Sequence, residues 1–277
     1  MTAPAARARP ATPSEIATEE TLRFLERALP PAPARVLEVG CGDGLVALAL
    51  AAAGYDVTAL DLSIERPETG AALPSDVPRR AGEAPGRVRW VEADFLYHAE
   101  DEPYAALVFT RSLHHMAPVE ATLDHALALL HPGGLLAAEE FAYDRVNIQT
   151  ARWLYDLESV LVAADLLAPV GGAAEGAAEG EGAAVSAEGN PLGRWRREHT
   201  HDPPLQTGHA ILGAARERFE LTAVEEAPYL YRYLCERLEP TERGARVARR
   251  ALELESRLIR ERDITAAGLR VIGRRPG

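Results

Sequence analysis

The chain has 277 residues, 47% of them hydrophobic and 26% charged, which is the composition of a globular protein large enough to bury a full core. Its formal net charge of −12 disfavours nucleic acid as a main partner, because phosphate binding depends on clustered Lys and Arg. Two cysteines cannot form a disulfide framework or a zinc cage, and no stretch has the length of a membrane span or the hydrophobic core of a signal peptide. These features predict a cytoplasmic protein with no membrane partner.

The N-terminal part predicts a helix, a strand and a glycine-rich turn. Residues 1–13 lack apolar periodicity and are predicted to form a disordered tail. Ser14 is expected to cap a helix that runs to about residue 29, where a proline cluster ends it. An apolar run at 36–39 predicts a buried strand. Three glycines then force a tight turn into a helix over 45–53, namely Gly40, Gly42 and Gly44.

This turn has the features of a nucleoside site. Glycines at alternate positions let the backbone approach a ligand closely, and the first N–H groups of the following helix are free to bind it. The next predicted strand, 55–60, ends in Asp61. Asp61 follows Gly40 by about 20 residues, the spacing at which an acidic side chain reaches a bound ribose. The pattern predicts a nucleoside cofactor across the ends of a parallel sheet.

The sequence Glu38-x-Gly40-x-Gly42-x-Gly44 resembles the E/D-x-G-x-G-x-G loop of the class I S-adenosylmethionine-dependent methyltransferases. The dinucleotide fingerprint would place its third glycine where this chain has Leu45. A glycine-rich turn in another kind of α/β domain is the alternative that this stretch alone leaves open. The resemblance implies that the loop holds the methionine part of S-adenosylmethionine. The residues expected to bind the cofactor there are Glu38, Gly40, Cys41, Gly42, Gly44 and Thr110, with Asp61 and Leu62 at the ribose.

Residues 65–86 contain four prolines and are predicted to be a loop, and residues 88–95 read as a third strand. That strand ends in Asp94 and Phe95, which look like the family's adenine site. There the carboxylate accepts a hydrogen bond from the exocyclic amine, and the neighbouring residue packs on the ring. A loop or cap role for Asp94 is the alternative.

Two histidines follow the fourth predicted strand, 105–110. The run Ser-Leu-His-His-Met at 112–116 resembles many small-molecule methyltransferases. The resemblance implies that His115 faces the reactive sulfonium as a catalytic residue and that His114 contacts the substrate. Imidazole titrates near working pH, so it is suited to orienting or deprotonating a nucleophile. A histidine that caps the next helix or bonds the backbone is the alternative.

The fifth predicted strand ends in two neighbouring carboxylates. A helix over 119–130 and a His-Pro-Gly-Gly turn precede this strand, 135–141. Isolated buried charges are costly, so one of Glu139 and Glu140 is expected to face the active site and the other to be paired or capping. We expect Glu140 to be the catalytic carboxylate in the pocket.

Residues 142–218 are predicted to be a lid inserted between strands five and six. Residues 148–168 read as a helix, 170–190 as a disordered Gly/Ala/Glu linker, and 207–218 as a second helix. Lids at this place in the fold class cover the substrate, so the expected substrate contacts are Tyr143, Trp195, His199 and His201. The histidine spacing alone does not fix a metal site, and no metal is expected.

The C-terminal part, 219–277, predicts the remaining strands of one sheet around a helix over 241–262. The expected fold is a doubly wound, mostly parallel, seven-stranded Rossmann-like sheet. Its S-adenosylmethionine-binding core is expected to span residues 14–141. The last strand, 268–273, is expected to lie antiparallel beside strand five.

The resemblance implies a methyltransferase that moves a methyl group from S-adenosylmethionine to an O or N atom of a small molecule. Nucleic-acid enzymes of this class carry D/N-P-P-Y/F after strand four, where this chain has residues 111–114, Arg-Ser-Leu-His. The protein is expected to be a monomer or homodimer. The alternatives are a non-catalytic S-adenosylmethionine-binding protein and, on a similar sheet, a nicotinamide-dependent oxidoreductase.

Overall fold

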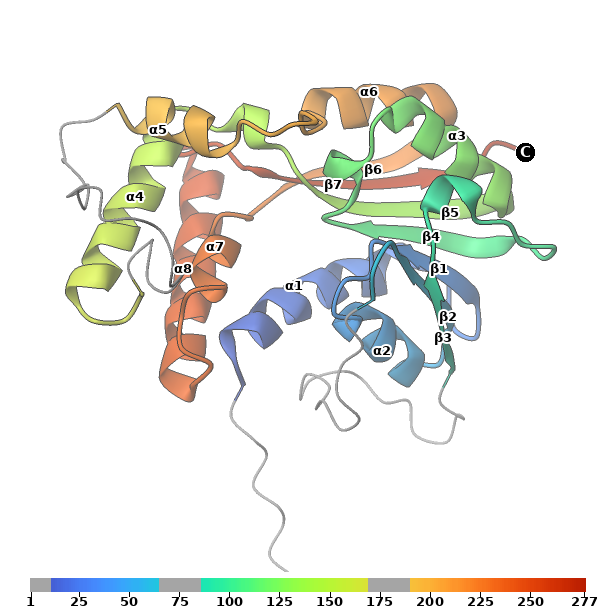
Figure 1. The fold of residues 1–277 in the computed structure, drawn as a ribbon, viewed down its shortest axis with the longest axis horizontal. Helices are drawn as coiled ribbons and strands as arrows, with labels where there is room; N and C mark the ends of the chain where they lie inside the picture. Colours follow the sequence, from blue (N-terminus) through green and yellow to red (C-terminus); the bar gives the residue numbers. More distant parts are fainter. Residues whose placement is uncertain (1–10, 65–85, 169–189) are drawn as a thin grey trace, which may run out of the picture.

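The computed structural model describes residues 11–64, 86–168 and 190–277. They form one seven-stranded sheet in the order β3-β2-β1-β4-β5-β7-β6 (Figure 1). The first five strands pair in parallel, and β7 pairs antiparallel with both β5 and β6. This order confirms the expected fold class, including the antiparallel strand beside strand five. The strands are β1 Arg35–Val39, β2 Asp56–Asp61, β3 Val88–Glu92, β4 Tyr104–Thr110, β5 Leu130–Phe141, β6 Glu220–Ala227 and β7 Gly268–Arg274.

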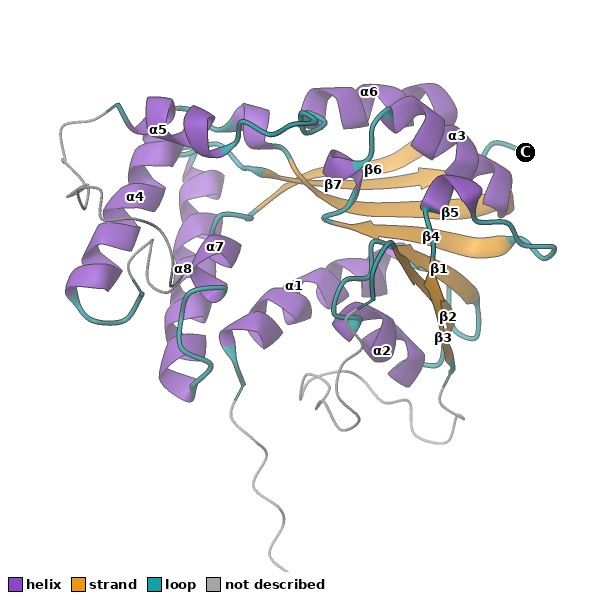
Figure 2. Ribbon diagram, in the orientation of Figure 1, coloured by secondary structure: helices purple, strands orange, loops and turns teal. Residues whose placement is uncertain are grey.

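Helices cover both faces of the sheet, as a doubly wound fold requires (Figure 2). One face packs against α1 and α2 and the other against α3 and α6. The central strands are apolar on both sides because both of their faces are buried. The helices are α1 Pro13–Ala28, α2 Leu45–Ala52, α3 Val119–Leu129, α4 Ile148–Ala163, α5 Pro191–Glu198, α6 Gly208–Arg218, α7 Tyr231–Cys235 and α8 Glu242–Glu261.

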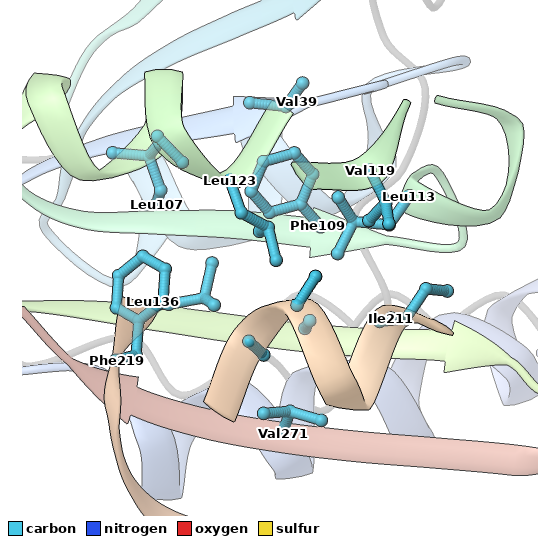
Figure 3. Packing of buried hydrophobic residues seen from close by; sticks show 14 of the residues in the cluster. Val39, Leu107, Phe109, Leu113, Val119, Leu123, Leu136, Ile211, Phe219 and Val271 are labelled. Atoms are coloured by element: carbon cyan, nitrogen blue, oxygen red, sulfur yellow. The ribbon is translucent and has the colours of Figure 1, made fainter. Parts of the chain in front are cut away.

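The core between the sheet and the α3–α6 layer holds the strand ends in place (Figure 3). Phe109 of β4, Leu123 of α3 and Ile211 of α6 are buried there and belong to one cluster. Leu113, which is fully buried, extends this core into the turn after β4. The turn that carries the two neighbouring histidines is therefore anchored by its own apolar residue.

A second cluster joins α4, α5, α7 and α8, which we call the helical unit; it lies on the left of Figure 1, beyond the end of β5. The expected lid, 142–218, is wrong in one part, because α6 packs with α3 on the sheet. Conversely, α7 and α8 come from the C-terminal part of the chain and join the helical unit. Sequence proximity to α5 did not decide where α6 packs, because α6 makes its contacts with α3, β6 and β7.

Several predicted boundaries differ from the observed ones. Thr12, rather than Ser14, caps α1 in a capping box with Glu15, so the helix begins at Pro13. The His-Pro-Gly-Gly segment lies within β5, which begins at Leu130. The predicted loop and linker, and most of the predicted tail, lie outside the described residues.

Candidate active site

Two adjoining cavities lie where the parallel strands end. The large cavity, about 640 Å³, extends from the glycine turn to the helical unit, and the small cavity, about 360 Å³, lies beyond the ends of β2 and β3. Gly40, Arg111 and His115 line both of them. Ligands bind at this edge of open α/β sheets, at the point where the strand order reverses.

The glycine turn brings bare backbone to the cavities. Gly40 has φ +76°, and a Cβ there would lie 2.4 Å from Ser112 Cβ, so glycine allows the turns after β1 and β4 to cross closely. Gly42 has φ +51°, and no heavy atom of the described residues lies within 4 Å of the position its Cβ would take. The backbone at Gly42 and Cys41 therefore faces the open space of the large cavity.

Gly44 has a different role from the expected one, since it is not among the described residues that line either cavity. It begins α2 at φ +69°, and a Cβ there would lie 2.3 Å from the Trp90 ring. The third glycine lets α2 pack over β3. The motif could not distinguish this packing role from ligand contact.

Glu38 is fully buried at the wall of the large cavity. Its Oε1 accepts a hydrogen bond from the Thr110 hydroxyl at 3.3 Å, while Oε2 has no partner in the described part of the chain. Burial raises the pKa of Glu38 to about 8, and the Thr110 hydrogen bond opposes that rise. A buried carboxyl group with one unsatisfied oxygen beside a cavity is well placed to receive a donor from a ligand.

The acidic residues after β2 and β3 line the small cavity. Asp61 Oδ2 accepts a hydrogen bond from the Gly42 N–H at 2.8 Å, which fixes the carboxylate against the glycine turn. Leu62 beside it is 72% exposed, so an apolar side chain stands at the cavity rim. Asp61 and Leu62 therefore lie together at the small cavity, just where β2 ends.

Asp94 caps a turn and also lines the small cavity. Its Oδ1 accepts from the Leu96 N–H at 2.9 Å and caps a short 3-10 turn, Phe95–Tyr97, yet the residue also lines the small cavity. Phe95 lines the cavity as well, but its ring is buried edge-to-face against Phe109.

Glu140 does not face the pocket as expected, because this carboxylate is fully buried and is not one of the described residues around the cavities. Its Oε1 accepts hydrogen bonds from the N–H groups of Ser112 and Leu113 at 3.0 and 2.9 Å. Its Oε2 lies 2.8 Å from Nδ1 of His114. Glu140 organises the turn after β4, and His114 lies between it and the large cavity.

Glu139 is the paired carboxylate, as expected for the one that does not face the pocket. Arg232 donates to its Oε2 at 2.9 Å, and Arg270 donates two hydrogen bonds to its Oε1 at 2.8 and 2.6 Å. Burial raises the pKa of Glu139, but the charges of the two arginines outweigh it and lower the pKa to about 2. Neither strand-end carboxylate is therefore free to contact a substrate.

Three of the five expected substrate contacts line the large cavity, His114, His199 and His201. Tyr143 and Trp195 are not among its described lining residues. Trp195 is buried, donates from Nε1 to the Tyr143 carbonyl at 3.1 Å, and stacks on His199 at 3.7 Å. The rings of Tyr143 and Trp195 both stack against the His199 ring.

Sequence reasoning missed a wall of the large cavity made by α7 and the residues just before it. Tyr229, Tyr233 and Glu236 line it, and all three lie beyond the end of β6 at Ala227. Glu255 of α8 accepts three backbone N–H groups at the start of α7 and so ends the strand early. The aromatic cluster Tyr-Leu-Tyr-Arg-Tyr was the signal available in the sequence.

The described residues provide neither a metal site nor a membrane-spanning helix. They contain no group of three or more His, Cys, Asp or Glu side chains that could hold a metal ion. They also contain no helix with both the length and the apolar character needed to cross a membrane.

Known proteins resemble this chain over part of their length. An uncharacterized methyltransferase of Mycobacterium tuberculosis is 33% identical over 122 residues, which are 43% of this chain and 56% of that protein. A ubiquinone biosynthesis O-methyltransferase of Xylella fastidiosa is 33% identical over 122 residues, which are 42% of this chain and 45% of that enzyme. The chain thus spans about half the length of the curated relatives it matches.

Among solved structures, the N-methyltransferase NodS from Bradyrhizobium japonicum, in complex with S-adenosyl-L-homocysteine, aligns with a TM-score of 0.47 and 13% identity over 98% of this chain and 90% of that chain. A family model described as a methyltransferase domain matches residues 12–162, which is more than half of the sequence. The matched residues include β1 to β5, the glycine turn and both neighbouring histidines. The chain therefore belongs to the class I S-adenosylmethionine-dependent methyltransferase family.

Proposed function

We propose that the protein moves a methyl group from S-adenosylmethionine to an oxygen or nitrogen atom of a small molecule. The observation that carries this proposal is the unsatisfied Oε2 of Glu38 beside the bare backbone of Gly42, with Asp61 held against the same turn. A carboxyl group for an amino group and a second carboxylate for a ribose suit the polar groups of this cofactor.

The two cavities suit the two ends of the cofactor. Glu38, Thr110 and the backbone at 40–42 would hold the methionine part in the large cavity. Asp61 and Leu62 would hold the ribose, and Asp94 with Phe95 the adenine, in the small cavity. The part of the large cavity that faces the helical unit is left for the methyl acceptor.

The cofactor, when bound, supplies a methyl group on a positively charged sulfonium. The chain's part is to align a nucleophile and exclude water, which the helical unit does by covering the strand ends. His115 lies at the junction of the two cavities, where we expect it to contact the acceptor. Partial burial and the neighbouring His114 lower the pKa of His115, so the ring is neutral at pH 7 and able to accept a hydrogen bond.

The acceptor side of the large cavity favours a small organic molecule. Its wall is largely aromatic, with Phe141 stacked on Tyr229 at 4.5 Å and Tyr233 nearby, and Glu236 adds an acidic group. A net charge of −12 is unfavourable for a nucleic-acid acceptor. The name of the Xylella relative adds support for an oxygen acceptor within this class.

The proposal is tested by replacing Asp61 and measuring S-adenosylmethionine binding by calorimetry. Asp61→Ala removes a charge-assisted hydrogen bond to the ribose and should weaken binding by about 1.5–3 kcal/mol, roughly 10- to 150-fold in Kd. Asp56→Ala is the matched control, because Asp56 is exposed at the opposite end of β2. Equal affinity of the wild type and Asp61→Ala would remove the ribose assignment. If the wild type binds tightly yet methylates no phenol or amine of a broad panel, the protein binds the cofactor without catalysis.

A further inference from the structure

We propose that Arg111 binds a carboxylate of the methyl acceptor, which makes small aromatic acids the preferred substrates. This inference rests on the proposed function and names the substrate class of the same site. Three features of Arg111 carry it: its position at both cavities, its left-handed backbone and a guanidinium group that no described residue binds. The aromatic wall of the large cavity accounts for the rest of the acceptor.

Arg111 lies where the two cavities meet. It is the first residue after β4, which ends at Thr110, and it lines both the large and the small cavity. Its side chain is exposed, at the edge of the sheet where open α/β folds bind their ligands. The cofactor is proposed to extend through both cavities, so a group at their junction lies near the place where methyl donor and acceptor meet.

The backbone of Arg111 is held in a conformation that glycine or asparagine adopts at lower cost. Its φ of +62° lies in the left-handed region, which other side chains rarely adopt. The Arg111 N–H donates to the Glu139 carbonyl at 2.8 Å. The next residue, Ser112, donates its N–H to Glu140 at 3.0 Å and its hydroxyl to the Val39 carbonyl at 2.6 Å. Bonds on both sides maintain the strain, and an arginine at such a position indicates that its side chain has a use.

The guanidinium of Arg111 has all of its donors available. It makes no hydrogen bond or ion pair with any residue in 11–64, 86–168 or 190–277. The large cavity has one other arginine among its described lining residues, Arg232. The two terminal nitrogens of that buried side chain already donate to Glu139, Thr21 and the Ala17 carbonyl. A free guanidinium binds a carboxylate through two parallel N–H groups, so Arg111 suits an anionic ligand.

The charge of Arg111 reaches the acceptor side of the large cavity. Burial raises the pKa of Tyr229, and among the charges that oppose this rise Arg111 acts more strongly than Arg232. The same holds for Glu236, whose pKa is also raised by burial. Both residues line the wall around α7, on the side that faces the helical unit. An acidic acceptor therefore meets a cation there, in a protein whose net charge of −12 otherwise repels it.

The same wall suits an aromatic ring. The rings of Phe141 and Tyr229 stack with their centroids 4.5 Å apart, and the Tyr233 ring lies 6.0 Å from Phe141. All three residues line the large cavity. Aromatic side chains bind a further ring by offset stacking or edge-to-face contact. Together with Arg111, they favour an aromatic acid that carries an O–H or N–H group as the methyl acceptor.

The test uses substitutions that preserve the backbone. Arg111→Asn removes the charge while asparagine tolerates the positive φ, and Arg111→Lys keeps the charge but loses the planar pair of donors. Arg262→Asn is the matched control, because Arg262 has φ +64° at the end of α8 and is not among the described residues that line either cavity. Circular dichroism should show that all three variants are folded.

Calorimetry on protein loaded with S-adenosylhomocysteine then measures the preference for acids. The probes are phenols and anilines that carry a carboxylate on a chain of zero, one or two methylene groups, each paired with its primary amide. The wild type and Arg262→Asn should bind at least one acid about tenfold or more tightly than its amide. Arg111→Asn should bind the two equally, and Arg111→Lys should keep part of the preference. A wild type without this preference, or an unchanged preference in Arg111→Asn, would overturn the proposal.

The cofactor also carries a carboxylate, so a second arm measures its binding alone. Affinity for S-adenosylhomocysteine should stay within about threefold of the wild type in Arg111→Asn. If this variant weakens S-adenosylhomocysteine about tenfold but leaves methylthioadenosine unchanged, which lacks the amino-acid part, then Arg111 binds the cofactor and the acceptor assignment is wrong. Failure of the wild type to bind S-adenosylhomocysteine would refute the proposed function, while the comparison of acids with amides on the unloaded protein would still report on Arg111.

Discussion

At the scale of single residues, Glu38 and Glu139 show how the surroundings of a buried carboxyl group set its charge. Both side chains are 1% exposed. Glu38 lies near the end of β1, and Glu139 lies near the end of β5. Burial raises the pKa of Glu38 to about 8, whereas two arginines lower the pKa of Glu139 to about 2. Glu38 is therefore neutral at pH 7 in the free protein, and Glu139 is ionised and structural.

The raised pKa of Glu38 predicts that cofactor binding releases a proton. An ammonium group beside Glu38 would stabilise its carboxylate and lower its pKa, so the proton held at pH 7 would pass to the buffer. Calorimetry in buffers of different ionisation enthalpy should give nearly one proton released per site at pH 7 and almost none above about pH 9, where Glu38 is already ionised. Glu38→Gln should abolish the release. A wild-type release that does not depend on pH would contradict the assignment.

At the scale of elements, the glycine turn combines two requirements that a sequence motif does not separate. Gly40 and Gly42 both have positive φ, but a Cβ at Gly40 meets Ser112 Cβ and one at Gly42 meets open space. Gly40 lets the turns after β1 and β4 cross closely, and Gly42 leaves room for a ligand.

This difference predicts that alanine at Gly40 and alanine at Gly42 destabilise the fold to unequal extents. Gly42→Ala should cost about 1 kcal/mol of unfolding free energy from backbone strain, and Gly40→Ala should cost about 2 kcal/mol more because the Cβ of Ser112 is fixed to the backbone. Urea unfolding measures both values. In a Ser112→Gly background the difference should shrink, and an unchanged difference would show that the crossing is not the cause.

The helical unit is also assembled by buried polar contacts at element ends. Glu255 of α8 accepts the N–H groups of Tyr229, Leu230 and Tyr231 at 2.8 to 2.9 Å. This carboxylate turns the chain from β6 into α7 and aims the aromatic residues at the large cavity. Acidic residues are favourable at helix N-termini, where free N–H groups collect.

At the scale of the whole molecule, Glu139 connects the sheet to α1 and to α7 of the helical unit. It lies on β5 and binds Arg270 of β7, Arg232 of α7 and the Thr21 hydroxyl of α1. Breaking one partner of a buried charge pair is strongly destabilising, because the other charge is left behind.

Arg232→Met should therefore lower the free energy of unfolding by about 3 kcal/mol at pH 7. Because the folded-state pKa of Glu139 is depressed, its stabilisation is complete above about pH 4.5 and is lost as pH falls toward 2. Urea unfolding between pH 7 and 3 should show this fall in the wild type and a smaller one in Arg232→Met.

Arg257→Met is the control for that measurement, because Arg257 pairs with Glu261 on the exposed face of α8. It should change stability by less than about 0.5 kcal/mol. If Arg232→Met changed stability as little as this control, the contact of Glu139 with α7 would not stabilise the fold.

Much of the fold was predictable because its signals are local. Strand periodicity, the glycine turn and the spacing to Asp61 each lie within a short stretch, and all three agree with the observed sheet. The position of α6 was not predictable in this way. Its apolar face would suit either a lid or the sheet, and contact with α3 decided between them.

The sequence by itself determined the sheet, its antiparallel last strand and the strand ends at which a nucleoside cofactor is expected. Only the tertiary structure decided that Gly44 packs on Trp90 and that Glu140 binds His114. It also decided that Tyr143 and Trp195 stack against His199. The physical reason is that a side chain's role in a site depends on partners far away in sequence. Glu139 and Glu140 are adjacent on one strand, yet one faces two arginines and the other faces a histidine.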